Sequence, residues 1–121
     1  MLFIQYPKCS TCQKAKKWLD AHKISYTDRH IVEDHPSYDE LKQWHEASGL
    51  PLRKFFNTSG LLYKDMQLKD KLPDMSEEEQ LKLLASNGML VKRPLVVDGD
   101  LVLIGFKEAE WEERLLDRTR V

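Results

Sequence analysis

Apolar and polar residues follow a strand-like period at the start of the chain and then a helical one. Leu2–Tyr6 is a short apolar run that stops at Pro7, the pattern of a buried strand. Ser25–Val32 mixes aromatic, hydroxylated and β-branched residues and predicts a second strand. Between these runs, apolar residues recur at helical spacing, namely Ala15, Trp18 and Leu19. The order predicts a βαβ unit with parallel strands.

The middle of the chain carries two capping-box signatures, in which a serine precedes a glutamate by three residues. Ser37–Glu40 predicts the start of a helix that ends at Gly49, and Ser76–Glu79 predicts one that closes at Asn87-Gly88. The intervening segment predicts a helical turn and then a loop, at Leu52–Phe56 and Asn57–Gly60.

The last third of the chain predicts a hairpin followed by a helix. Leu95–Val97 and Leu101–Ile104 are apolar runs joined by Asp98-Gly99-Asp100, and Asp-Gly between such runs is a strong hairpin signal. Lys107–Leu116 has an apolar stripe at helical spacing. The predicted order is therefore β-α-β, several helices, then β-β-α, which is an α/β fold.

Length and charge narrow the classes of protein to consider. The 121 residues suit a single domain, residues 1–121, with a helical insertion at about 37–90. The formal net charge of -1 offers no overall attraction to nucleic acid or to an anionic membrane. No apolar run is long enough to span a membrane, and no secretory leader is recognisable. We expect a cytoplasmic monomer that binds neither DNA nor membranes.

Cys9 and Cys12 form a CxxC pair at the predicted start of the first helix. No third cysteine is present, and the four histidines follow no ligand spacing, so we predict no metal site. Unpaired N–H groups and the helix dipole favour a thiolate at a helix start. Cys9 is therefore the candidate nucleophile and Cys12 the candidate resolving thiol. The alternative is that both cysteines only fill space in the core.

Arg93-Pro94 stands immediately before the predicted hairpin. A proline can begin a strand without losing a ladder hydrogen bond, so the pair could simply direct the chain. It could instead face the Cys9 loop, where Arg93 would stabilise a thiolate or bind an anionic substrate. The residues alone favour neither interpretation.

Two segments carry a resemblance to a known family: Tyr6-Pro7-Lys8-Cys9-Ser10-Thr11-Cys12 with Lys14-Ala15, and Arg93-Pro94-Leu95-Val96-Val97. With the hairpin and helix that follow, they resemble the arsenate reductase and Spx/MgsR family over essentially the whole chain. The resemblance implies a thioredoxin-like fold with a helical insertion and a redox-active first cysteine, here Cys9. It also implies a cis proline at Pro94 beside the active site.

The family divides into reductases and regulators. Arsenate reductases of this class use one loop cysteine, electrons from glutathione or glutaredoxin, and three arginines that bind the oxyanion. This chain has Arg93, but Asn57 and a position near Gly105 stand where the other two arginines would be. We therefore expect weak arsenate reduction or none.

Spx-like regulators carry CxxC as a redox switch and bind the α subunit of RNA polymerase. The middle segment of this chain, residues 50–63, looks more like the reductase branch. Our first hypothesis is therefore a thiol–disulfide oxidoreductase with the catalytic residues Cys9, Cys12 and Arg93. The substrate-binding candidates are Lys8, Ser10, Thr11, Asn57 and Pro94.

The proposed oxidoreductase needs no bound cofactor. Its electrons would come from an external thiol donor such as glutathione, glutaredoxin or thioredoxin, so its partner is a redox protein or a small thiol. The alternative is a redox-sensing regulator that binds the RNA polymerase α subunit.

Overall fold

A four-stranded mixed sheet organises the chain, with strands in the order β2-β1-β3-β4. β1 pairs with β2 in parallel and with β3 antiparallel, and β3 pairs antiparallel with β4. This computed structural model describes residues 1–116, so residues 117–121 of the predicted domain lie outside the described part. The strands are β1 (Leu2–Gln5), β2 (Thr27–His30), β3 (Leu95–Asp98) and β4 (Leu101–Ile104).

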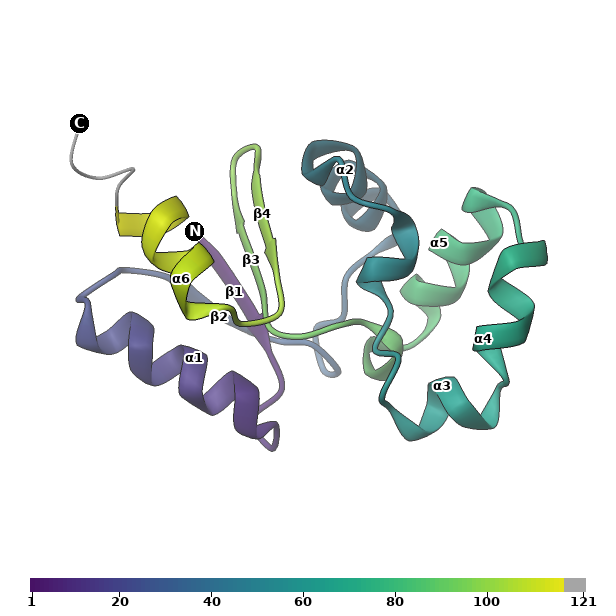
Figure 1. Cartoon of the computed structure of the whole chain (residues 1–121), viewed down its shortest axis with the longest axis horizontal. Coiled ribbons are helices and arrows are strands. Elements are labelled where there is room, and N and C mark those ends of the chain that lie inside the picture. The colour runs from purple at the N-terminus through teal and green to yellow at the C-terminus, as the bar shows by residue number, and fades with distance from the viewer. Residues whose placement is uncertain (117–121) are drawn as a thin grey trace.

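Helices lie to both sides of the sheet, with α1 and α6 on one side and α2 to α5 on the other (Figure 1). They are α1 (Ser10–Ala21), α2 (Tyr38–Ser48), α3 (Leu61–Asp65), α4 (Leu68–Lys71), α5 (Glu77–Ser86) and α6 (Glu108–Trp111). A π-helical turn, Glu112–Leu116, continues α6. Within residues 1–116, no helix is both long and apolar enough to cross a membrane. The order confirms the predicted β-α-β, helices, β-β-α arrangement.

Alternating residues of the sheet enter two separate apolar clusters. Ile4 of β1 and Leu95 of β3 pack into the larger cluster, which includes the helices of the insertion. Phe3 and Val96, one position along each strand, pack with Trp111 and α1 in the other cluster. Both faces of the two central strands are therefore buried, and burial on both faces fixes the register between them.

Both predicted capping boxes are present. The Ser37 backbone N–H donates to Glu40 Oε1 at 3.1 Å, and the Glu40 N–H donates to Ser37 Oγ at 3.2 Å. Ser76 and Glu79 make the same reciprocal pair at the start of α5. Gly49 ends α2 in the left-handed region, with φ of 67°, as its position after the apolar stripe predicts.

Gly88 is needed for a reason that differs from the prediction. The helix α5 ends at Ser86, and Asn87 has an extended backbone, so no left-handed residue closes it. A Cβ atom added to Gly88 would lie 1.9 Å from the carbonyl oxygen of Ile31. The glycine therefore allows the end of the insertion to pass against the chain that follows β2.

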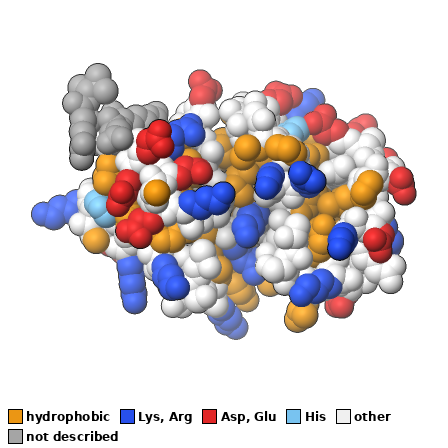
Figure 2. Space-filling view, in the orientation of Figure 1, with side chains coloured by type: hydrophobic (Ala, Val, Ile, Leu, Met, Phe, Trp, Pro, Cys, Tyr) orange, Lys and Arg blue, Asp and Glu red, His pale blue; other side chains and the backbone are white. Residues whose placement is uncertain are grey.

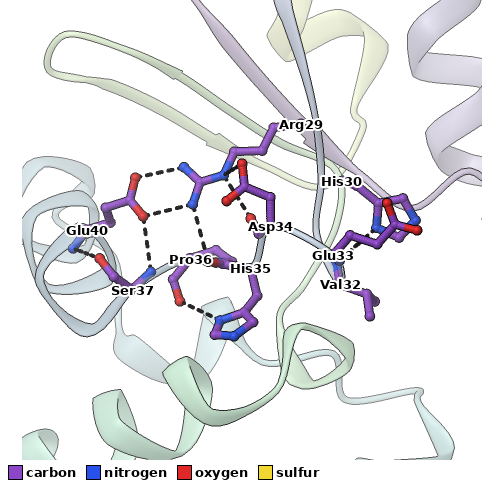
Figure 3. A network of polar contacts seen from close by, with 9 residues as sticks. All are labelled: Arg29, His30, Val32, Glu33, Asp34, His35, Pro36, Ser37 and Glu40. Atoms are coloured by element: carbon purple, nitrogen blue, oxygen red, sulfur yellow. Dashed lines mark hydrogen bonds and ion pairs between the residues drawn. The ribbon is translucent and has the colours of Figure 1, made fainter.

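The second strand is shorter than the predicted Ser25–Val32, because a side chain ends it. The ring nitrogen Nδ1 of His30 accepts hydrogen bonds from the backbone N–H groups of Val32 and Glu33, both at 3.1 Å (Figure 3). These two N–H groups are thereby turned away from the β ladder. The chain leaves the sheet at His30 and enters a turn.

Helices α3 and α4 were not predicted, because neither start has a capping signature. The residue before α3 is Gly60 and the residue before α4 is Gln67, and neither provides a side-chain hydrogen bond to its helix. Gln67 also has a left-handed backbone, with φ of 55°, which composition does not reveal for this residue type.

A bidentate ion pair joins the edge strand to the insertion (Figure 3). The Arg29 guanidinium of β2 donates to both carboxylate oxygens of Glu40 at 2.7 and 2.8 Å. It also donates to the carbonyl oxygens of Asp34 and His35. Hydrogen bonding from Arg29, with smaller help from the Ser37 cap, lowers the pKa of Glu40 to about 2. This pair fixes where α2 begins relative to the sheet.

Replacing Glu40 tests the ion pair separately from the capping box. Glu40→Gln keeps an amide that can fill the capping box but removes the charge facing Arg29. Removing the charge should lower the free energy of unfolding by about 1–2 kcal/mol at neutral pH. The loss stays this small because 34% of the Glu40 side chain is exposed, so that solvent screens the ion pair. The measurement is urea unfolding of both proteins.

The loss should depend on pH in one direction. The native pKa of Glu40 is depressed, so its contribution is complete above the ordinary carboxyl pKa and disappears as pH falls toward about 2. Glu79→Gln is the matched control, since Glu79 fills the other capping box and has no arginine partner. Equal losses for the two variants would contradict the role of Arg29.

Candidate active site

The antiparallel pairing of β1 with β3 brings the CxxC loop and the Arg93-Pro94 turn to one edge of the sheet. Ile4 is opposite Leu95, so continuing the same register places Tyr6 opposite Arg93. The Arg93–Pro94 peptide bond is cis, as the family resemblance implies. Of the two interpretations of Arg93-Pro94, this arrangement favours the one in which the turn faces the Cys9 loop.

Cys9 is the N-cap residue of α1. Its backbone is extended, and its sulfur accepts a hydrogen bond from the Cys12 backbone N–H at 3.4 Å. The Cys9 N–H donates to the Tyr6 carbonyl oxygen at 2.9 Å, which closes the loop between β1 and α1. Cys9 is partly exposed, whereas Cys12 is completely buried one turn into the helix. The two thiols therefore differ in access to solvent.

The surroundings of Cys9 favour its thiolate. Partial burial by itself would raise the pKa of the Cys9 thiol. Hydrogen bonds from the side chain and backbone of Cys12, the charge of Arg93 and a hydrogen bond from the Thr11 backbone outweigh this effect. The pKa of Cys9 is therefore lowered from its ordinary value, as expected for a thiol at a helix start.

Cys12 has the opposite character. Burial is the main cause that raises the pKa of its thiol, and the neighbouring Cys9 also raises it. A hydrogen bond from the Tyr6 backbone and the Arg93 charge lower it in part, and the resulting pKa is about 12. Cys12 therefore stays protonated while Cys9 is a thiolate. The pair is one reactive thiol beside one reserve thiol.

Arg93 is half-buried and held by two contacts. Its guanidinium lies over the Tyr6 ring, 5.1 Å from the ring centroid, and Nη1 donates to the Met89 carbonyl oxygen at 3.4 Å. Within residues 1–116, Arg93 has no carboxylate at ion-pair distance. Among the described residues no acid therefore neutralises its positive charge, which acts on the two thiols.

The other predicted substrate-binding residues in the first segment lie around Cys9. Lys8 precedes it and is exposed, and Ser10 and Thr11 form the exposed start of α1. Pro94 is buried, and its carbonyl oxygen accepts from the Gly105 N–H at 2.8 Å. This hydrogen bond places Gly105 next to the Arg93-Pro94 turn.

The Asn57 backbone is bonded to the segment that precedes Arg93. Its N–H donates to the Leu90 carbonyl oxygen at 2.7 Å, beside an isolated bridge between Phe56 and Val91. Its side-chain oxygen accepts from Ser59 Oγ at 3.4 Å, a contact within the predicted loop. The bridge connects the two ends of the insertion just before Arg93, whereas the Asn57 side chain is engaged in its own turn.

The lysines near the CxxC pair contribute unequally to the local charge. Lys16 donates to the Tyr26 hydroxyl at 2.6 Å and lies near Asp20 and Asp28, so these two carboxylates partly neutralise its charge. In Figure 2 basic and hydrophobic side chains occupy the lower rim near the start of α1, which Figure 1 shows at lower centre.

Over the described range, no group of three or more His, Cys, Asp or Glu side chains is placed to hold a metal.

Tyr6 is the site residue that sequence reasoning missed. The sequence places it at the end of a buried strand and within the segment that carries the family resemblance, but gives it no role of its own. Its ring packs against the apolar cluster that contains Ile4 and Leu95, and the Arg93 guanidinium lies over that ring. This contact joins two segments far apart in the sequence, so the sequence does not reveal it.

The chain matches the ArsC family over residues 4–114. Among curated proteins, it is 58% identical to the uncharacterized protein YusI of Bacillus subtilis, over 93% of this chain and 96% of that protein. It is 31% identical to the regulatory protein MgsR of the same species, over 91% of this chain and 86% of MgsR.

Solved structures show the same fold. A putative ArsC family related protein from Bacteroides fragilis has a TM-score of 0.90 at 63% identity, covering 93% of this chain and 94% of the other. A possible arsenate reductase from Streptococcus mutans has a TM-score of 0.83 at 47% identity, covering 88% and 90%. The predicted thioredoxin-like α/β fold is confirmed.

Alkylation kinetics test the difference between the two thiols. We expect Cys9 to react with iodoacetamide at lower pH than an ordinary cysteine does, because its pKa is lowered. Cys12 should react slowly, because it is buried with a pKa of about 12. Arg93→Met should slow alkylation of Cys9 by about twofold to tenfold at mildly acidic pH. Modification at each cysteine is measured by mass spectrometry.

Lys8→Met is the matched control, because it removes an exposed and screened charge next to Cys9. It should change the rate less than Arg93→Met does. Equal alkylation rates for Cys9 and Cys12 at every pH would contradict the assignment of roles.

Proposed function

The chain belongs to the ArsC family, and we propose that it acts as a thiol–disulfide oxidoreductase in which Cys9 attacks and Cys12 resolves. One observation carries this proposal: two thiols one helical turn apart have opposite character, the partly exposed Cys9 with a lowered pKa and the buried Cys12 with a raised one. A pair of thiols that only filled space in the core would not need this difference.

In the first step, the Cys9 thiolate attacks one sulfur of a substrate disulfide. A bond forms between Cys9 and that sulfur, the substrate disulfide breaks, and the other substrate sulfur leaves as a thiolate that takes a proton from water. The helix start and the Arg93 charge both favour the attacking thiolate. The product is a mixed disulfide on Cys9.

In the second step, Cys12 loses its proton and attacks the Cys9 sulfur, which forms an internal disulfide and releases the second substrate thiol. Once Cys9 is in the mixed disulfide, its negative charge no longer raises the pKa of Cys12. The remaining influences on Cys12 are burial, which opposes ionisation, and Tyr6 and Arg93, which favour it. The first step thus makes the second easier.

The substrate gains two electrons and the protein dithiol is oxidised, so an external thiol must restore it. A donor of the glutathione, glutaredoxin or thioredoxin class would reduce the internal disulfide by the reverse sequence of attacks. The exposed residues Lys8, Ser10 and Thr11 surround the approach to Cys9 and are proposed to contact substrate or donor. This chemistry uses no resident cofactor.

Arsenate is proposed to be a poor substrate. Asn57 and the Gly105 position stand where the resemblance implies two further arginines, and the Asn57 side chain bonds Ser59 in its own loop. Arg93 is then the only one of the three proposed anion ligands in this chain. A multiply charged oxyanion depends on several charge-assisted contacts, so its affinity should be low.

Trapping with a Cys12 variant tests the two-step cycle. In Cys12→Ser the resolving thiol is absent, so we expect a persistent mixed disulfide on Cys9 when the protein meets a disulfide such as oxidised glutathione. The adduct is measured by mass spectrometry of the intact protein without reductant.

Cys9→Ser is the matched control and should form far less adduct, because Cys12 is buried and protonated. The wild type should instead accumulate the internal disulfide. Absence of any adduct on Cys12→Ser under oxidising conditions would contradict the proposed function.

A second candidate function is redox-sensing regulation through the RNA polymerase α subunit. The observation in its favour is the 31% identity to a protein named as regulatory, MgsR, over most of both chains. The same CxxC pair would then act as a switch, oxidised to a disulfide without turnover.

Binding to the isolated C-terminal domain of the RNA polymerase α subunit separates the two candidates. For an oxidoreductase we expect no retention of that domain on the immobilised chain, whether reduced or oxidised. Retention that changes when the Cys9–Cys12 disulfide forms would favour the regulator and displace the enzyme. A Cys9→Ser, Cys12→Ser double variant controls for retention that is independent of the thiols.

A further inference from the structure

We propose that Tyr6 is a positioning residue of the thiol site, because its ring holds the Arg93 guanidinium in the place from which its charge reaches Cys9. This inference rests on the proposed role of Cys9 as the attacking thiol. Tyr6 acts through Arg93.

The register of the sheet places the two side chains together. Ile4 pairs with Leu95 at the end of the ladder, Tyr6 follows β1 directly, and Arg93 comes two residues before β3. The Tyr6 side chain packs against the apolar cluster on the insertion side of the sheet, and the Arg93 guanidinium lies over its ring. The guanidinium carbon is 5.1 Å from the Tyr6 ring centroid, within the range of a cation–π contact.

The Tyr6 ring also contacts a residue of β2, the strand that pairs with β1 on its other side. The His30 ring meets it edge to face, with centroids 5.7 Å apart and planes at 89°. His30 is fixed in turn, because its Nδ1 accepts the N–H groups of Val32 and Glu33 (Figure 3). With Nδ1 used as an acceptor, the neutral ring carries its proton on Nε2. The backbone contacts of His30 thus hold its ring against Tyr6.

Arg93 needs such a support, because its other contact is weak. The hydrogen bond from Nη1 to the Met89 carbonyl oxygen is 3.4 Å long, near the outer limit for a hydrogen bond. No carboxylate within the described residues fixes the guanidinium. The aromatic face therefore restrains the cation without neutralising it, whereas an acidic partner would cancel part of its effect on the thiolate.

A double-mutant cycle on Tyr6 and Arg93 tests the proposal, with the rate of Cys9 alkylation across pH as the readout. We expect Tyr6→Leu to slow alkylation of reduced protein by about twofold to fivefold at mildly acidic pH. The pH profile of the alkylation rate should shift to higher pH, and the rate at high pH should be unchanged. In an Arg93→Met background, Tyr6→Leu should have no further effect, because the cation it positions is gone.

Further variants separate positioning from a structural role. Tyr6→Phe keeps the ring and should retain the wild-type profile, and Tyr6→Met gives a second way to remove the ring. Tyr63→Leu is the matched control, since Tyr63 is also half-buried but its ring contacts Phe56 rather than Arg93. It should leave the Cys9 profile in place even where it lowers the melting temperature.

Two results would overturn the proposal. The first is equal slowing by Tyr6→Leu in the wild-type and Arg93→Met backgrounds, which would mean that Tyr6 acts on the Cys9 loop directly. The second is a Tyr6→Phe profile displaced as far as that of Tyr6→Leu, which would assign the effect to the hydroxyl. Alkylation needs no substrate, so a failed trap on Cys12→Ser would reject the proposed function while leaving this test intact.

Discussion

The antiparallel pairing of β1 with β3 is the constraint on which the thiol site depends. The chain leaves β1 toward Cys9 and enters β3 from Arg93, so both segments lie at the same edge of the sheet. Slipping the register by one residue would exchange Ile4 with Phe3, which pack in different apolar clusters on opposite faces. Core packing on both faces therefore also determines which side chain lies opposite Arg93. The geometry of the site follows from the packing of residues that take no part in its chemistry.

The helix start converts this placement into a chemical difference between two identical side chains. The first turn of α1 has unpaired N–H groups, and the Cys9 sulfur accepts from one of them as the N-cap. A thiolate accepts such a hydrogen bond better than a thiol does, so capping and ionisation favour each other. Cys12 lies three residues further along, where its backbone N–H supplies that hydrogen bond while its own side chain is completely buried. The spacing of three residues thus places one sulfur at the cap and the other in the core.

Local signals made much of the fold predictable, because capping boxes, the Asp-Gly turn and apolar periods act over a few residues. The same reasoning placed Cys9 at the helix start. It missed α3 and α4, which lack caps at Gly60 and Gln67, and it extended β2 beyond His30, whose ring ends the strand. Gly88 was predicted to close a helix, whereas the structure requires a glycine there because the chain passes close to Ile31. The uncapped starts of α3 and α4 and the hydrogen bonds to the His30 ring are local features, but they have no recognisable sequence signal. The approach of Gly88 to Ile31 and the partnership of Tyr6 with Arg93 instead join segments that are distant in the sequence.

The charge of the site argues for its substrate class. A cation that faces a single thiolate gives a locally neutral pair, which suits attack on an uncharged disulfide and departure of a singly charged sulfur. A multiply charged oxyanion would leave excess negative charge in a half-buried place, and only further cations could offset that cost. In this chain Asn57 and Gly105 themselves carry no charge, whereas Cys12 provides a second sulfur. The presence of a resolving thiol and the absence of two anion-binding arginines therefore agree with each other, both in the charge of the site and in its chemistry. It favours exchange between sulfurs over reduction of an oxyanion.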